Sequence, residues 1–189
     1  MKYLGPNADL DSEACLEVDL DDGVLNITLN RLQQRNAINA ALSLALERLL
    51  MAVRGDEAVR VVVLCDNGPD FCVGLETASM SGIATSIGQM LHQLAQPVIA
   101  RVHGQCHGDA MALLESCDIV IASDDADFDS GGKAVQRDDV VTLSVPASVL
   151  DAQTYQLARE LAAKDALALR FTKETLRRVP DVSWDEVLN

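Results

Sequence analysis

The sequence has no run of 18 or more uncharged apolar residues, and its N-terminal residues lack the apolar core of a signal peptide. We therefore expect no membrane span and a cytoplasmic location. The five cysteines are an odd number without CxxC spacing, which argues against a disulfide framework or a metal site. Basic residues are scarce, since 15 Lys and Arg face 29 Asp and Glu. The resulting net charge of -14 excludes nucleic acid as an expected partner.

The 189 residues are 49% hydrophobic, which is enough to bury the core of one domain. Residues 1–14 are polar and are expected to form a terminal arm. Alternating apolar residues on both sides of an Asp-Asp-Gly turn predict a β-hairpin within 16–30. Apolar residues at three- and four-residue steps then predict a helix over 38–53, with Asn36 or Asn39 as its cap.

Three apolar, β-branched segments follow at 59–65, 97–102 and 118–122, and they are expected to be buried strands. Helical periodicity lies between them, at 83–94 and 108–116. The middle of the chain is therefore predicted to alternate strand and helix, with right-handed crossovers between parallel strands.

The polar, glycine-containing segment 124–139 predicts a surface loop. Helices are expected over 147–163 and 165–178. The whole pattern predicts an α/β protein with a core over 15–142 and a C-terminal helical segment over 143–189.

Three motifs carry the functional signal, although each is weak alone. They are Leu29 to Asn39 (LNRLQQRNAIN), Phe71 to Glu76 (FCVGLE), and Pro97 to Ala110 (PVIARVHGQCHGDA) followed by SCDIVIA. In the second and third motifs a glycine allows a tight turn, so that the next N–H can point into a cavity. The third motif also places a helix N-terminus after its turn, where negative charge can be held.

Together the motifs resemble the signatures of the crotonase (enoyl-CoA hydratase/isomerase) superfamily over residues 16–123. The resemblance implies a crotonase-like ββα superhelix, internally shortened, with C-terminal helices. It implies an acyl thioester substrate, either an acyl-CoA or an acyl group on acyl carrier protein. Coenzyme A would enter as part of the substrate, and no tightly bound cofactor is expected. Because crotonases are commonly trimers or dimers of trimers, a homo-oligomer (trimer or hexamer) is expected.

By the resemblance, the N–H groups of Leu75 and Asp109 are two donors that stabilise a thioester enolate. Such a donor contributes about 3 to 4 kcal/mol to catalysis. The residues implied to line the CoA site are Arg35, Asn36, Ala37, Ile38, Gly74 and Gly108. An acidic chain disfavours the CoA polyanion, so a local basic patch is needed, for which Arg31, Arg35 and Arg101 are candidates.

The sequence departs from the family pattern at both catalytic glutamates. Ala112 stands at the position of one, and the other falls near Gly132. Between Phe128 and Val140 the chain is also shorter than the resemblance implies, by a segment that would form a pocket wall. Hydration by two glutamates is therefore not supported.

His107, Asp109 and Asp129 are the candidate replacements. Histidine titrates near neutrality and suits general acid–base catalysis, although a packed or partly exposed histidine is the simpler interpretation. Each aspartate is either a base or a solvated loop carboxylate. Cys72 and Cys106 are interpreted as core residues, because a cysteine nucleophile needs an activating neighbour.

Two functions remain open from the sequence. The paired N–H groups predict an enzyme that acts on an acyl thioester through an enolate, by hydratase-, isomerase- or decarboxylase-type chemistry. Ala112, Gly132 and the shortened segment instead fit a catalytically degenerate homologue that binds a thioester or a partner protein without turnover. An acidic scaffold subunit would need only the fold and an oligomer interface.

Overall fold

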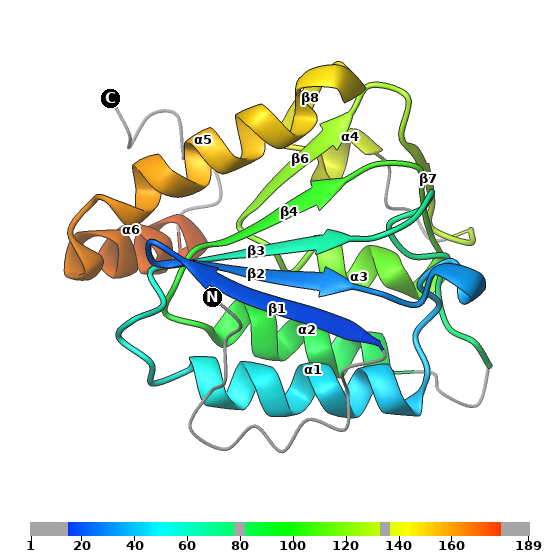
Figure 1. The fold of residues 1–189 in the computed structure, drawn as a ribbon, viewed down its shortest axis with the longest axis horizontal. Helices are drawn as coiled ribbons and strands as arrows, with labels where there is room; N and C mark the ends of the chain where they lie inside the picture. The colour runs from blue at the N-terminus through cyan, green and yellow to red at the C-terminus, as the bar shows by residue number, and fades with distance from the viewer. Residues whose placement is uncertain (1–14, 78–81, 133–136, 179–189) are drawn as a thin grey trace.

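The computed structural model describes residues 15–77, 82–132 and 137–178. One sheet organises this part of the chain, and helices cover both of its faces (Figure 1). Its strands lie in the order β1 (Leu16–Asp21), β2 (Val24–Leu29), β3 (Val61–Asp66), β4 (Val98–Val102), β6 (Ile119–Ser123) and β8 (Leu143–Val145). The pair β1–β2 is antiparallel, and every later pair in the sheet is parallel. The prediction of an α/β protein with parallel strands is confirmed.

The predicted hairpin and the predicted helix cap are both confirmed. Asp22 and Gly23 have positive φ angles of 47° and 81°, as a tight two-residue hairpin turn requires. Helix α1 (Ala40–Val53) begins after Asn39, whose side chain accepts a hydrogen bond from the Leu42 N–H at 2.9 Å. Of the two candidate caps, Asn39 is therefore the right one.

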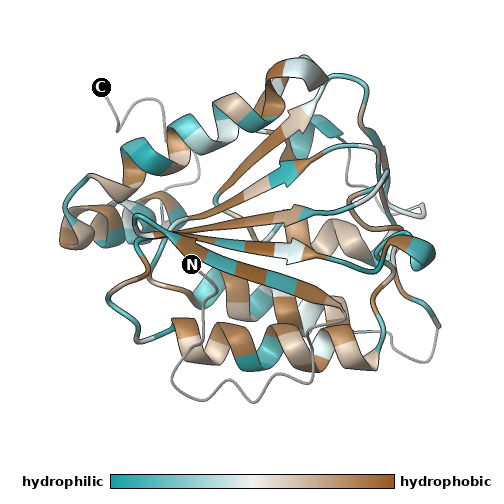
Figure 2. Cartoon of the chain, viewed as in Figure 1, coloured by the Kyte–Doolittle hydropathy of each residue, from teal (hydrophilic) through white to brown (hydrophobic). Residues whose placement is uncertain are grey.

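The sheet separates two apolar clusters. Val62 and Leu64 of β3 pack into the cluster under α1, α2 (Ile83–Gln93) and α3 (Met111–Leu114), whereas Val61 and Val63 pack under α5 (Leu150–Ala162). All six residues of β3 are buried, and Figure 2 shows the central strands as predominantly hydrophobic. The uninterrupted apolar run follows from helices on both faces.

The helix predicted over 108–116 is confirmed in a shorter form, and the loop predicted over 124–139 was wrong in part. The segment 108–116 is a 3-10 turn, η3 (Gly108–Ala110), followed by the single helical turn α3. The predicted loop 124–139 contains β7 (Asp127–Asp129) and α4 (Arg137–Val140). Strand β7 pairs in parallel with β5 (Gln105–His107) in a second, two-stranded sheet. Three-residue strands carry too little periodicity to be recognised, and distant pairing determines them.

Arg137 closes the short connection between β7 and β8. Its guanidinium donates to the carbonyls of Ser123 at 3.0 Å and Ala126 at 2.9 Å, and to Ser144 Oγ at 2.8 Å. It also lies over the Phe128 ring, 5.3 Å from the centroid. One side chain thus holds together the ends of the shortened segment.

The C-terminal helices are confirmed with slightly different bounds. A 3-10 turn, η4 (Ala147–Val149), precedes α5, and α6 (Ala166–Arg178) follows. Lys173 of α6 is 1% exposed, and its Nζ lies 2.5 Å from Asp118 Oδ2 and 2.7 Å from the Gln96 carbonyl. Burial lowers the pKa of Lys173 against the opposing effect of Asp118. This contact fixes α6 to the start of β6.

No helix in the described part of the chain is long and apolar enough to cross a membrane. The expected arm over 1–14 lies outside the described residues. The division at residue 142 stays a prediction, although β8 beyond it pairs with β6 of the main sheet.

Lys173→Ala should lower the free energy of unfolding by about 3 kcal/mol, because it leaves the Asp118 carboxylate buried without its closest cation. Arg170→Ala on the same helix is the matched control. It removes the exposed pair with Glu174 and should cost only about 0.5 kcal/mol or less. Urea denaturation of both variants measures the difference, and equal losses would contradict this role of Lys173.

Candidate functional site

The segment 71–75 is held on one side by the segment around Ile38. The Ile38 N–H donates to the Gly74 carbonyl at 2.8 Å, and the Glu76 N–H donates to the Ile38 carbonyl at 2.9 Å. The N–H of Leu75 takes no part in this bridge. Because successive N–H groups of an extended chain point to opposite sides, the Leu75 N–H is directed away from Ile38.

On its other side the same segment pairs with β5. The Cys72 N–H donates to the Gln105 carbonyl at 3.1 Å, and the His107 N–H donates to the Cys72 carbonyl at 3.0 Å. A Cβ placed on Gly74 would lie 3.2 Å from the His107 carbonyl oxygen and 3.9 Å from the Asp109 nitrogen. We call residues 71–75 and 105–109 together the donor junction. The segments of both predicted donors therefore meet there.

Two glycines shape the donor junction. Gly74 and Gly108 have φ angles of +102° and +60°, which disfavour any side chain. A Cβ on Gly108 would meet no atom of the described residues within 4 Å, so they leave this side of the turn open. Since η3 and α3 together are short, they provide little of the expected helix dipole, and any negative charge bound here would depend on individual N–H groups.

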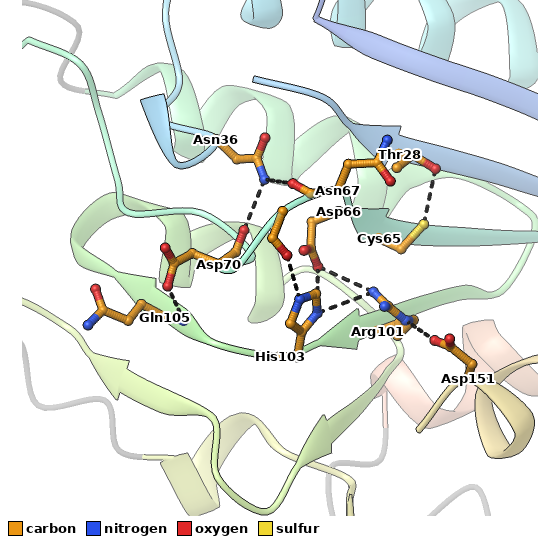
Figure 3. Close-up of polar contacts among 11 residues, drawn as sticks. Thr28, Asn36, Cys65, Asp66, Asn67, Asp70, Arg101, His103, Gln105 and Asp151 are labelled. Carbon is orange, nitrogen blue, oxygen red and sulfur yellow. Dashed lines mark hydrogen bonds and ion pairs between the residues drawn. The ribbon is translucent and has the colours of Figure 1, made fainter. Parts of the chain in front are cut away.

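Asn36 ties the first motif to the loop after β3. It is fully buried, has a φ of 57°, and accepts a hydrogen bond from the Arg31 N–H at 2.8 Å. Its amide nitrogen donates to the carbonyls of Asn67 at 3.0 Å and Asp70 at 2.9 Å (Figure 3). The Asn36 side chain is thus a structural link between two segments of the site.

The backbone of the predicted CoA loop is largely engaged within the protein. The N–H groups of Asn36, Ala37 and Ile38 donate to Arg31, Gln34 and Gly74, respectively. The Ala37 carbonyl accepts from the Arg31 guanidinium. A carbonyl has a second lone pair, so any backbone contact of these residues with CoA would use their carbonyl oxygens.

Arg35 connects the three segments through its side chain. Its Nε donates to Asp70 Oδ2 at 2.6 Å and its Nη2 to Gln105 Oε1 at 2.5 Å, while Asp70 Oδ1 accepts from the Gln105 N–H at 3.0 Å. The hydrogen bond from Arg35 holds the pKa of Asp70 below its ordinary value.

The ion pairs of Arg31, Arg35 and Arg101 give little support to the predicted basic patch for CoA. Arg31 pairs with Glu76 at 3.0 Å, and Arg35 pairs with Asp70. Arg101 pairs with two carboxylates on the opposite side of β3 and β4. All three arginines are thus partly or fully neutralised, and they supply no surplus of positive charge.

His107 lies at the end of β5 and pairs with a carboxylate that the sequence did not single out. Its Nε2 is 3.0 Å from Asp127 Oδ2. The register places His107 opposite Asp129, whose Oδ1 accepts from the Gly131 N–H at 2.8 Å. The alternation in Ala-Asp-Phe-Asp was a signal that could have identified Asp127, because it puts both aspartates on one face.

The two cysteines of the donor junction are core residues, as predicted. Cys72 and Cys106 are fully buried. Burial raises the pKa of Cys72 to about 12 and that of Cys106 well above its ordinary value. Neither thiol is activated as a nucleophile.

Gly74→Ala should lower the free energy of unfolding by about 1 to 3 kcal/mol, because it forces a side chain into a positive-φ conformation. The new Cβ would also push against the His107 carbonyl at 3.2 Å. Gly55→Ala is the control, since its Cβ would meet nothing within 4 Å. Urea denaturation should show at most a small effect there, and a similar loss in both variants would contradict the assigned strain.

The sequence model of the enoyl-CoA hydratase/isomerase family matches residues 19–136. Over 223 residues the chain is 24% identical to hydroxycinnamoyl-CoA hydratase-lyase from Pseudomonas fluorescens, covering 90% of this chain and 81% of that protein. It is 30% identical to mevalonyl-coenzyme A hydratase from Aspergillus fumigatus, covering 88% of this chain and 64% of that protein. The structure of a probable enoyl-CoA hydratase from Mycobacterium thermoresistibile is similar, with a TM-score of 0.80, 27% identity and 89% of each chain covered. The fold is crotonase-like, and the chain belongs to the enoyl-CoA hydratase/isomerase family of the crotonase superfamily.

Proposed function

We propose that this protein is an enzyme of the hydratase/isomerase type, acting on an acyl thioester whose enolate is held by the N–H groups of Leu75 and Asp109. The observation that carries the proposal is the donor junction, where Gly74 brings the first donor segment against the second. Two preorganised N–H groups at one carbonyl oxygen would stabilise an enolate by about 3 to 4 kcal/mol each.

A CoA thioester is the proposed substrate class. Relatives of this chain include a hydroxycinnamoyl-CoA hydratase-lyase, a mevalonyl-coenzyme A hydratase and a 2,3-dehydroadipyl-CoA hydratase. Coenzyme A would be part of the substrate and not a resident cofactor. An acyl group on acyl carrier protein is the alternative carrier. Assembly as a trimer or hexamer and a cytoplasmic location stay predictions.

His107 is the proposed acid–base group, because Ala112 and Gly132 cannot transfer a proton. Asp127 holds Nε2 of the ring, and none of the described residues bonds to Nδ1. In a hydration, His107 would accept a proton from water as hydroxide adds to the β-carbon and the thioester becomes an enolate. Nδ1 of His107, which took up this proton, would then return it to the α-carbon. Asp129 is the alternative base.

The degenerate homologue is the competing function, and Ala112 and Gly132 motivate it. It predicts thioester binding without any chemical change. Thermal stabilisation by CoA esters and turnover therefore have to be measured on the same sample.

The purified protein should convert at least one of crotonyl-CoA, feruloyl-CoA and malonyl-CoA, followed by absorbance and mass. His107→Gln should lower kcat about 10²- to 10⁴-fold with little change in thioester affinity. Asp127→Asn should lower kcat less, because the ring loses only its orienting partner. His92→Gln, an exposed histidine on α2, is the matched control and should leave kcat unchanged.

Each result decides between the functions. Full activity of His107→Gln would overturn the assignment of His107. Stabilisation by the esters without turnover would favour the degenerate homologue. No stabilisation by CoA esters or by acyl carrier protein thioesters would overturn acyl-thioester binding altogether.

A further inference from the structure

A partly buried charged cluster, with Asp66 fully buried, lies at the carboxyl ends of β3 and β4, outside the donor junction (Figure 3). Asp66, whose side chain is fully buried, lies 3.3 Å from His103 Nδ1 and 3.4 Å from Arg101 Nη1 through the same oxygen, Oδ1. Arg101 Nε lies 2.5 Å from Asp151 Oδ1 on α5. The other oxygen of Asp66, Oδ2, is buried without a hydrogen-bond partner among the described residues.

The neighbours of His103 define where its protons are. Nε2 lies 2.9 Å from the Gly68 carbonyl, which only accepts, so Nε2 carries a hydrogen. Nδ1 faces the Asp66 carboxylate, and a hydrogen there gives a second charge-assisted bond to Oδ1, besides the one from Arg101 at 3.4 Å. Without that hydrogen, Nδ1 would present a lone pair to a buried anion and could accept only from Arg101 at 3.4 Å.

The charges around His103 favour the imidazolium. Asp66 of β3, Arg101 of β4 and Asp151 of α5 carry one net negative charge, which a protonated His103 cancels. Asp70 of the following loop also acts on His103, but Arg35 neutralises it. In agreement, the hydrogen bond with Asp66 raises the pKa of His103 against the opposing effect of burial.

His103 contacts the loop that leads into the first donor segment at two points. Its side chain donates to the Gly68 carbonyl, and its own carbonyl accepts from the Phe71 N–H at 3.1 Å. The next residue leaves no gap, because a Cβ on Gly104 would lie 1.9 Å from the Pro69 carbonyl oxygen. The loop 67–71 therefore packs directly against residues 103 and 104. Its last residue, Phe71, is four positions before Leu75.

We propose that His103, held as an imidazolium by Asp66, is a positioning residue that fixes the loop 67–71 and thereby the direction of the Leu75 N–H. It touches no substrate and acts through the loop. The effect on thioester affinity rests on the proposed function, whereas the effect on the loop does not.

The proposal fixes the sign of a pH dependence. A histidine whose pKa is raised by folding contributes its full stabilisation below about pH 6.5, its ordinary value. That contribution is lost as the pH rises through the raised pKa. Loop order in the wild type should therefore decrease on the alkaline side of pH 6.5.

Hydrogen exchange in the whole 189-residue chain tests the proposal from pH 6 to pH 9, after correction for intrinsic exchange rates. In His103→Gln, the amides of Phe71 and Cys72 should exchange about tenfold faster than in the wild type at pH 6. Gln can still donate to Gly68 but carries no charge, so the variant should lose the pH dependence. Amides of α1 report on global stability, and His92→Gln is the control for a histidine-to-glutamine change.

Unchanged exchange in His103→Gln, or a wild-type loop whose corrected exchange does not vary with pH, would overturn the proposal. If the variant fails to fold, the wild-type profile alone decides in the same way. Crotonyl-CoA affinity should also fall about tenfold in the variant at pH 6. A wild type that binds no thioester would defeat the proposed function and leave the exchange result to decide the role of His103.

Discussion

Pairing on both edges of the short segment 71–75 is the constraint on which the site depends. One edge is bonded to Ile38 and the other to β5, so the segment behaves as an inner strand although it is only a few residues long. Its polar groups are thereby fixed by main-chain geometry. Around it, Asn36, Arg35 and Asp70 join the three sequence motifs through side-chain hydrogen bonds.

The site therefore separates two tasks that an enolate mechanism needs. Charge stabilisation is assigned to the main chain, and its geometry is built from glycines and paired segments. Proton transfer has to come from side chains, and there the chain departs from its family at Ala112 and Gly132. His107, which lies in the donor junction and pairs with Asp127, is the proposed proton carrier in place of the glutamates that the family pattern implies. The cluster of Asp66, Arg101 and His103 contacts the loop 67–71 through His103. It links that loop to α5 through the ion pair of Arg101 with Asp151.

Much of this could be predicted from the sequence, for identifiable reasons. The run from Val61 to Asp66 is apolar on both faces, and the turn at Asp22-Gly23 is specified locally, so the central strand and the hairpin were recognisable. Strands β5 and β7 were not, because each has three residues and forms only through pairing with the other. Likewise, the sequence does not show that Asp66 meets His103 or that Asp127 meets His107, since these contacts join residues 20 or more positions apart. The alternation over 126–129 places Asp127 and Asp129 on one face, but it does not name their partner.

Because the two proposed donors are main-chain groups, the side chains at their positions are free to diverge. Any residue except proline supplies an N–H, so Leu75 and Asp109 can differ from their counterparts in relatives without loss of the donor. The position of these N–H groups depends instead on the neighbours that fix the backbone, Gly74 above all. A search for reactive side chains would therefore miss the donor junction. Its similarity to the sites of relatives would be recognised mainly from its glycines.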